Sequence, residues 1–304
     1  MKRNKNILLS LGVIVVSLIV SIFAFVPISN IHPKDGATWM SKVDGDTLIN
    51  NLSMPGTHDS GATHSIFDVS GKCQDDSISS QLNMGVRFLD LRLQARKDEF
   101  HIVHSFVDQA LTFESVLNDC VKFVRKNTSE FLILSIKEEA DAVDSTKWFE
   151  ELVLEYINEY PDVIKKDKAL PATLEECRGN IYIISRFRAD NVGIEAHYGW
   201  ADNASFEYNG LYVQDYYDCG NKDNKTTAIA SAFEVSKTTQ DKLVLNFTSC
   251  YFSDPFPPTY AGTAANAINP WLDDFLSNFE GDTGIVIMDF VSSNLTTSIY
   301  RRNY

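Results

Sequence analysis

The chain has little positive charge for its length. Only 27 of its 304 residues are Lys or Arg, against 41 Asp or Glu, and the formal net charge is −14 at pH 7. Binding to nucleic acid needs basic stripes that face the phosphate backbone, so this composition excludes nucleic acid as the partner. The same charge excludes adhesion to anionic lipid through bulk electrostatics. A phosphate-binding site in this chain must therefore be a local basic pocket.

Cysteine is also sparse, and its spacing matches no zinc site. The cysteines are Cys73, Cys120, Cys177, Cys219 and Cys250. Cys219 and Cys250 follow two consecutive candidate strands, so these two thiols are candidates for neighbours in space. The sequence leaves disulfide pairing open.

Residues 1–30 differ from the rest of the chain. A basic start at residues 1–5 precedes a largely apolar, uncharged run at residues 7–26, and no clean Ala-x-Ala cleavage site follows it. The run is long enough to span a bilayer, and its positive flank favours a cytosolic N-terminus. We therefore expect residues 1–30 to be a signal peptide or an N-terminal membrane anchor. The remainder is then secreted or held at the extracellular face of the membrane.

No linker, repeat or low-complexity tract interrupts the chain after residue 30, so we expect a single domain over residues 31–304. Eight apolar runs, β-branched or aromatic in character, are candidate strands within it. These runs cover residues 48–54, 86–93, 100–103, 131–136, 181–184, 211–213, 243–247 and 285–288.

Helical patterns lie between several of these runs. Apolar residues fall on one helix face within residues 113–124, 148–157 and 268–279, and Thr112 is a candidate N-cap for the first of these helices. Strands that alternate with helices form a parallel sheet, and eight strands predict an α/β fold of the (β/α)₈ TIM-barrel type. The second and third runs are joined by a segment too short for a full helix. We therefore expect the barrel to be distorted there.

Polar residues gather where these runs end. The set at or just past the C-terminal ends is His58, Arg92, His104, Lys137, Glu139, Arg186, Asp215 and Asp289. In a (β/α)₈ barrel these ends form one rim, where active sites are built. Histidines suit proton transfer near neutral pH, and basic side chains bind anions, so the set favours phosphoryl transfer. His101 competes with His104, but the two face opposite sides of a strand and His104 is nearer the rim.

Two stretches of the sequence resemble a known family. The residues SMPGTHDS at 53–60 and GVRFLDLR at 85–92 are similar to motifs of the bacterial phosphatidylinositol-specific phospholipases C. The resemblance runs from about Thr38 to Asp289, which is nearly the whole region after the leader. It implies a distorted (β/α)₈ barrel that acts as a lyase on phosphatidylinositol at a membrane surface. The products would be diacylglycerol and inositol 1,2-cyclic phosphate.

The resemblance also implies a role for each site residue. His58 would be the general base, supported by Asp289, and Arg92 would bind the phosphate. His104 would be the general acid, supported by Asp59. The inositol pocket would consist of Lys137, Glu139, Arg186, Asp215 and Tyr217.

Metal dependence is the main alternative within this fold. Eukaryotic relatives carry acidic metal ligands near the first histidine, whereas Arg92 stands here at the phosphate-facing position, as in metal-independent bacterial members. We therefore expect no metal and no cofactor, with calcium at Asp59 and Asp90 as the less favoured case. A metal-dependent phosphodiesterase on the same barrel and an inactive inositol-lipid binding module remain the alternative functions.

The sequence says less about the substrate's surroundings. The aromatic and proline-rich segment at residues 251–260 is a candidate contact with a lipid surface. We expect a monomer. Whether free phosphatidylinositol or a glycosylated anchor is preferred stays open, as does cleavage of the leader.

Overall fold

The computed structural model describes residues 35–64, 71–105, 107–254 and 256–304. Residues 35–304 cluster as one compact unit. The leader predicted for residues 1–30 lies outside the described residues. Among the residues that are described, no helix combines the length and apolar character that a membrane crossing requires.

A curled sheet of mostly parallel strands forms the centre of this unit. In spatial order its strands are β7 (Ile194–Glu195), β6 (Ile181–Arg186), β5 (Leu132–Glu138), β2 (Phe88–Arg96), β1 (Met54–Thr57), β11 (Ile285–Met288), β10 (Leu243–Phe247), β9 (Leu211–Gln214) and β8 (Ser205–Tyr208). All neighbours in this order are parallel except β8 and β9. The expected (β/α)₈ architecture and its distortion are therefore confirmed.

The distortion includes an open seam. Within the described residues, β7 and β8 do not pair with each other, although they are the two ends of the sheet. The antiparallel strand β8 covers the edge of β9 where a parallel neighbour would close a regular barrel. The connection over residues 196–204 joins β7 to β8.

The third apolar run is not a barrel strand. It forms β3 (Glu99–His104), which pairs antiparallel with β2 and with β4 (Val107–Thr112). The turn between β2 and β3 has positive φ at both Lys97 and Asp98, which is the geometry of a two-residue hairpin. The short connection that predicted an irregularity here is therefore a hairpin turn.

The first apolar run begins later than predicted. Residues Ile49–Asn51 form a 3₁₀ helix, η2, and strand β1 starts only at Met54. Pro55 and Gly56 lie inside β1, although both residues are rare in strand interiors. A Cβ atom on Gly56 would lie only 3.1 Å from the Phe88 Cβ of the neighbouring strand, so the close approach of β1 and β2 favours glycine there.

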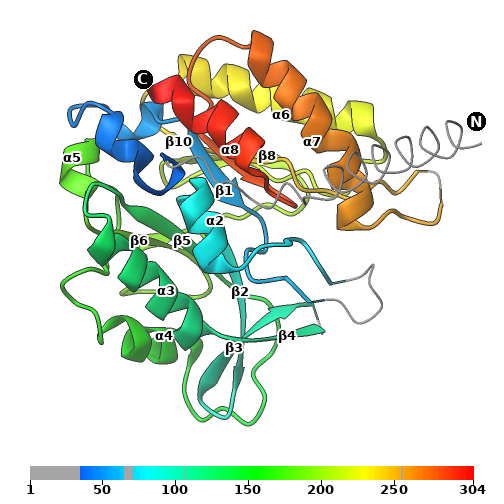
Figure 1. The fold of residues 1–304 in the computed structure, drawn as a ribbon. Coiled ribbons are helices and arrows are strands. Elements are labelled where there is room, and N and C mark those ends of the chain that lie inside the picture. The colour runs from blue at the N-terminus through cyan, green and yellow to red at the C-terminus, as the bar shows by residue number, and fades with distance from the viewer. Residues whose placement is uncertain (1–34, 65–70, 106, 255) are drawn as a thin grey trace, which may run out of the picture. The chain divides into compact units, whose positions relative to one another are not determined.

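Helices cover the outside of the sheet. They are η1 (Gly36–Lys42), α2 (Ile78–Met84), α3 (Phe113–Lys126), α4 (Phe149–Ile157), α5 (Leu174–Cys177), α6 (Lys222–Thr238), α7 (Ala261–Asn278), α8 (Ser293–Tyr300) and η3 (Arg301–Asn303). Helices α3 and α4 flank one part of the sheet and α6, α7 and α8 another (Figure 1). The predicted cap of α3 is confirmed, because the Ser115 N–H donates to Thr112 Oγ1 at 3.3 Å. Trp148, expected on the buried stripe of α4, instead precedes the helix and is 82% exposed.

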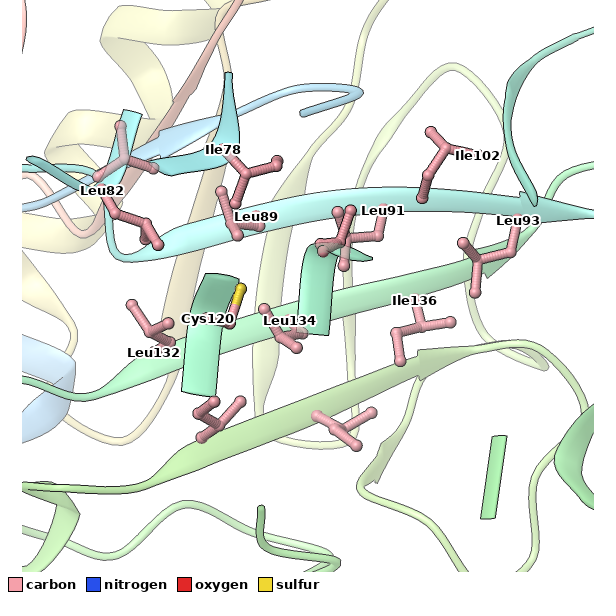
Figure 2. Packing of buried hydrophobic residues seen from close by; sticks show 14 of the residues in the cluster. Ile78, Leu82, Leu89, Leu91, Leu93, Ile102, Cys120, Leu132, Leu134 and Ile136 are labelled. Atoms are coloured by element: carbon pink, nitrogen blue, oxygen red, sulfur yellow. The ribbon is translucent and has the colours of Figure 1, made fainter. Parts of the chain in front are cut away.

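The alternation of side chains along the strands separates two apolar layers. Leu89, Leu91 and Leu93 of β2 pack between sheet and helices with Leu134 and Ile136 of β5 (Figure 2). The residues between them face the barrel interior, where Phe88, Ile133, Ile184, Leu245 and Ile287 form a second buried cluster. Parallel strands are expected to be buried on both faces in this way. The interior cluster forms the floor beneath the rim.

A buried ion pair ties the bottom of the barrel together. The Arg87 guanidinium donates twice to Glu130 Oε2, at 2.9 and 2.7 Å. Its other donors reach the main-chain oxygens of Leu82, Val86 and Gly36. Both charged side chains are fully buried, so each depends on the other for its charge balance.

The cysteines are all free and buried. Cys219 and Cys250 do lie close together, because a parallel bridge joins Asp218 to Tyr251 and the Cys219 thiol contacts the Tyr251 main-chain oxygen at 3.5 Å. The sequence-based expectation that these two cysteines are neighbours is confirmed.

Candidate active site

The functional side chains continue the interior face of the barrel strands. On β2, Phe88 belongs to the floor, and Asp90 and Arg92 follow it at steps of two. Because side chains on a strand alternate between faces, all three point to the interior. The same change from apolar to polar leads to Lys137 on β5 and Arg186 on β6, and to the residues that directly follow β1, β9 and β11, which are His58, Asp215 and Asp289. The predicted rim is therefore the upper interior of the barrel.

Most of the predicted residues share one cavity. It has a volume of about 520 Å³ and is lined by His58, Arg92, His104, Lys137, Arg186, Asp215, Tyr217 and Asp289, among others. Asp59 and Glu139 do not line it. They lie behind Arg92, with Asp59 Oδ2 at 3.8 Å and Glu139 Oε1 at 3.5 Å from the guanidinium nitrogens.

His58 and Asp289 form a dyad on adjacent strands. The pairing of Thr57 with Met288 brings the ends of β1 and β11 together, and His58 Nδ1 lies 2.7 Å from Asp289 Oδ1. Arg92 Nη2 lies 2.8 Å from His58 Nε2. A guanidinium only donates hydrogen bonds, so Nε2 is the acceptor and Nδ1–H donates to Asp289. Burial disfavours the imidazolium, but the charge and the hydrogen bond of Asp289, together with the charge of Asp90, outweigh it, and the pKa of His58 is raised.

A glutamine on the next segment holds this dyad in place. The Gln74 side-chain amide donates to the main-chain oxygens of His58, at 2.9 Å, and of Met288, at 2.8 Å. Its own oxygen accepts from the Val291 N–H at 3.2 Å. Gln74 thus bridges the backbones that carry the two members of the dyad. Its position between the strands gave no periodic signal in the sequence.

Several carboxylates surround the Arg92 guanidinium. Asp90 Oδ2 accepts from Arg92 Nε and Nη2, both at 3.3 Å, and Asp90 Oδ1 accepts from Arg186 Nη1 at 3.1 Å. Burial opposes the charge on Asp90, but the two arginines outweigh it and keep the Asp90 pKa well below its usual range. The sequence offered Asp90 as a candidate calcium ligand, and its position between two arginines was not predicted.

His104 and Asp59 face each other at a longer distance. His104 Nε2 lies 3.8 Å from Asp59 Oδ2. Asp59 is fully buried, and its side-chain oxygens make no hydrogen bond. Burial raises the pKa of Asp59 to about 7, against the opposing charge of Arg92. Burial, then Arg92 and His58, lower the pKa of His104 to about 4. In the free site the proton of this pair therefore resides on the carboxyl group at mildly acidic pH.

The far side of the cavity combines charge with aromatic rings. The Arg186 guanidinium stacks 3.7 Å from the centre of the Trp200 ring, and Trp200 Nε1 donates to Asp215 Oδ2 at 3.1 Å. The Tyr217 hydroxyl donates to Asp202 at 2.7 Å, which raises the Tyr217 pKa to about 12. Trp200 was not predicted, because it lies in the irregular connection between β7 and β8.

Among the residues that the structure describes, two sets of side chains could hold a metal ion, and both include Cys73. One is His58, Cys73 and Asp289, and the other is Asp59, Cys73 and His104. The calcium alternative needs the carboxylates of Asp59 and Asp90, but the Arg92 guanidinium already lies against both. A guanidinium there takes the place of a hard cation.

Comparison with known proteins identifies the family. The family profile "Phosphatidylinositol-specific phospholipase C, X domain" matches residues 52–187. A 1-phosphatidylinositol phosphodiesterase of Staphylococcus aureus (strain Newman) is 31% identical over 284 residues, which cover 84% of this chain and 89% of the relative. The chain belongs to the phosphatidylinositol-specific phospholipase C family.

Other members agree with this assignment. A 1-phosphatidylinositol phosphodiesterase of Listeria monocytogenes is 27% identical over 278 residues, or 87% of this chain and 84% of that protein. A solved phosphatidylinositol-specific phospholipase C of S. aureus superposes with a TM-score of 0.78 at 27% identity and covers 88% of this chain and 98% of that structure. The solved L. monocytogenes enzyme shares the fold, with a TM-score of 0.72 at 24% identity. The resemblance seen in the two sequence motifs is confirmed.

Proposed function

We propose that this phosphatidylinositol-specific phospholipase C family member cleaves phosphatidylinositol by attack of an inositol hydroxyl on the adjacent phosphorus. The products are diacylglycerol and inositol 1,2-cyclic phosphate. The observation that carries the proposal is the arrangement of four side chains in one cavity. The His58–Asp289 dyad and His104 both face it, and Arg92 lies between them.

His58 is proposed as the general base. Its Nε2 is the accepting nitrogen, and its Nδ1–H is held by Asp289 at 2.7 Å. When Nε2 takes the proton of the attacking hydroxyl, the adjacent carboxylate stabilises the imidazolium that forms. The attack is intramolecular within the substrate, so the enzyme does not need to bring in a separate nucleophile.

Arg92 is proposed to bind the phosphoryl oxygens. A guanidinium can donate two parallel hydrogen bonds to a phosphate, which fixes its orientation as well as its charge. In the free site Arg92 Nη2 contacts His58 Nε2 at 2.8 Å. A phosphate that takes this donor leaves His58 Nε2 open to the inositol hydroxyl. Substrate binding thereby prepares the base.

His104 is proposed as the general acid for the glycerol oxygen. The charge of Arg92 is among the causes that hold the His104 pKa at about 4. A phosphate bound to Arg92 offsets that charge and adds a negative charge near the imidazole. The proton then moves from Asp59 to His104, where it can be delivered to the leaving group. Arg92 thus links phosphate binding to the protonation of the acid.

The inositol ring is proposed to occupy the far side of the cavity. Lys137, Arg186 and Asp215 line it and can pair with the ring hydroxyls. Tyr217 can pack against the face of the ring, and Glu139 holds Lys137 through a 2.7 Å hydrogen bond. These are the residues expected from the sequence, with Trp200 added as the wall that orients Arg186.

Comparing two leaving groups tests the acid and the base separately. His104→Ala should lose about 10²–10⁴-fold on phosphatidylinositol, because the diacylglycerol oxygen is a poor leaving group. The same variant should lose far less on a nitrophenyl ester of inositol phosphate, whose leaving group needs no proton. His58→Ala should be impaired on both substrates, since the attacking hydroxyl is the same.

The matched control is His101→Ala. His101 lies on the same strand as His104, 3.7 Å from Asp108, and does not line the cavity. Its loss should leave both rates nearly unchanged. If the nitrophenyl ester restores activity to His58→Ala instead, the two roles are reversed. If His104→Ala loses activity equally on both substrates, its role as general acid is refuted. Absence of turnover in the unmodified protein would favour the inositol-lipid binding module.

Action at a membrane surface is proposed from the rim. Phe256 and Tyr260 are exposed, and Tyr260, Tyr251 and Trp200 also line the mouth of the cavity. One solved S. aureus relative bears the description "Modulation of S.Aureus Phosphatidylinositol-Specific Phospholipase C Membrane Binding". Phe256→Ser should weaken sedimentation with phosphatidylinositol vesicles but not cleavage of the soluble nitrophenyl ester. Equal vesicle binding by the variant would rule out this contact.

Export of a monomeric enzyme completes the proposal. The proposed base, acid and phosphate-binding arginine are all present in one cavity of a single chain. The apolar run at residues 7–26 should carry the domain across the membrane. Protease added to intact cells should digest the domain, or it should appear in the medium. Recovery from the cytosol alone would contradict export, and sedimentation of a dimer would contradict the monomer.

A further inference from the structure

Cys73 lies at the centre of the site but has no place in the proposed reaction. Its side chain lines the cavity wall and is only 1% exposed. The backbone is fixed on both sides, because the Cys73 N–H donates to Ala62 O at 2.8 Å and its carbonyl accepts from Phe290 N at 2.7 Å. The sulfur, an Asp59 oxygen and a His104 ring nitrogen all lie within 4.8 Å of one another.

The two partners of this thiol have unused bonding capacity. Both Asp59 oxygens are buried without a hydrogen bond, and Arg92 Nε and His104 Nε2 each stand 3.8 Å from Oδ2. Within the described part of the chain, the His104 imidazole makes no hydrogen bond. A buried carboxyl group whose oxygens have no partner is costly, so this cluster favours a ligand that binds those oxygens.

We propose that Asp59, Cys73 and His104 form an inhibitory site for a soft divalent cation such as Zn²⁺ or Cd²⁺. Zinc takes sulfur, imidazole nitrogen and carboxylate oxygen at about 2.0–2.3 Å in a tetrahedral arrangement. Neighbouring donors are then about 3.5 Å apart, so these atoms need to approach one another by about 1 Å. The Cys73 thiol and any protonated Asp59 carboxyl release their protons to solvent as the bonds to the metal form, and nothing is oxidised.

The second cluster that contains Cys73 is the weaker candidate. His58 and Asp289 already bond to each other at 2.7 Å, and a metal would have to break that pair. Burial, and then the carboxylates of Asp289 and Asp59, raise the pKa of the Cys73 thiol, so a metal has to displace the thiol proton at either cluster. A thiolate ligand selects Zn²⁺ or Cd²⁺ over Ca²⁺ and Mg²⁺, which prefer oxygen.

Metal binding and its inhibitory effect are separable. Binding depends only on the three donors, whereas inhibition rests on the proposed function, because Asp59 and His104 are its acid pair. A metal bound to these side chains displaces the proton of Asp59. It also blocks the His104 nitrogen that would deliver that proton to the leaving group. Micromolar Zn²⁺ should therefore inhibit the enzyme and a chelator should restore it, while Ca²⁺ and Mg²⁺ at the same concentration should not inhibit.

The test is a Cd²⁺ titration of the full chain without substrate, followed by the ultraviolet charge-transfer absorption of the cadmium–thiolate bond. In the unmodified protein, the first and most tightly bound equivalent of Cd²⁺ should give this band. The band should be absent in Cys73→Ala. Cys250→Ala is the matched control, because Cys250 also lines the cavity but lies beside Cys219. His104→Gln should keep the band with at least tenfold weaker affinity.

The possible outcomes separate the proposals. A band that persists in Cys73→Ala, or that disappears in Cys250→Ala, would overturn the site. Cys73→Ala should keep its basal activity and circular dichroism spectrum while becoming at least tenfold less sensitive to Zn²⁺. If the unmodified chain shows no turnover, the cadmium band still reports on the metal site, and only the proposed function fails.

Discussion

Binding of a phosphate ligand should raise the pKa of His104. In the free site burial, Arg92 and His58 hold this pKa at about 4. A phosphoryl anion about 4 Å from the imidazole contributes about 4 kcal/mol at an effective dielectric constant of about 20, or about three pKa units. The His104 side chain is 30% exposed, so solvent screening reduces the effect. We expect a rise of about two units, to about 6.

Nuclear magnetic resonance of histidine-labelled protein measures this shift directly. The His104 signal is assigned by its absence in His104→Gln and followed against pH with and without a non-hydrolysable phosphonate analogue of phosphatidylinositol. Arg92→Gln provides a second arm, because loss of that cation should raise the His104 pKa even without ligand. A bound analogue that leaves the His104 pKa below 5 would refute the transfer of the proton from Asp59.

Three further predictions concern the supports of the site. Arg92→Lys should lose about 10²-fold or more in activity, since a point charge cannot reproduce the two parallel hydrogen bonds of a guanidinium. Both proteins are assayed in a strong chelator. If the unmodified protein loses its activity there and regains it with calcium, the role of the arginine is refuted. Glu130→Gln should lower the free energy of unfolding in urea by about 3–5 kcal/mol, because it leaves a buried guanidinium unpaired, whereas exposed Glu99→Gln should change it by less than about 0.5 kcal/mol. Gln74→Leu removes the hydrogen bond to the His58 carbonyl and should lower kcat about tenfold with little change in KM, and an unchanged kcat in steady-state assays would contradict the positioning role.

The sequence located the barrel and its rim because both depend on local patterns. Apolar runs bounded by polar residues marked the strands, and the polar residues at or just past the C-terminal ends of those runs marked the rim. His58 and Asp289 are 231 residues apart, yet the parallel pairing of their strands brings them to 2.7 Å. Once the rim was assumed, its residue types restricted the chemistry to acid–base work on a phosphate.

The features that the sequence did not predict depend on long-range packing. The hairpin of β2 and β3 arises from a turn of two residues, Lys97 and Asp98, whose positive φ values no apolar pattern encodes. Trp200 lies in an irregular connection and faces the cavity only because the sheet curls there. The bridge that Gln74 makes between two strands likewise depends on their tertiary contact.

Asp90 shows how an acidic chain can maintain a basic pocket. Arg92 and Arg186 both line the cavity, and two guanidinium groups so close would repel each other and resist burial. Asp90 accepts from both, with one oxygen for each, so the pair is held together by the carboxylate beneath it. The donors that point into the cavity remain for the phosphate and the inositol. A net charge of −14 is thus compatible with anion binding. Some of the acidic residues, such as Asp90, lie behind the arginines and orient them toward the cavity.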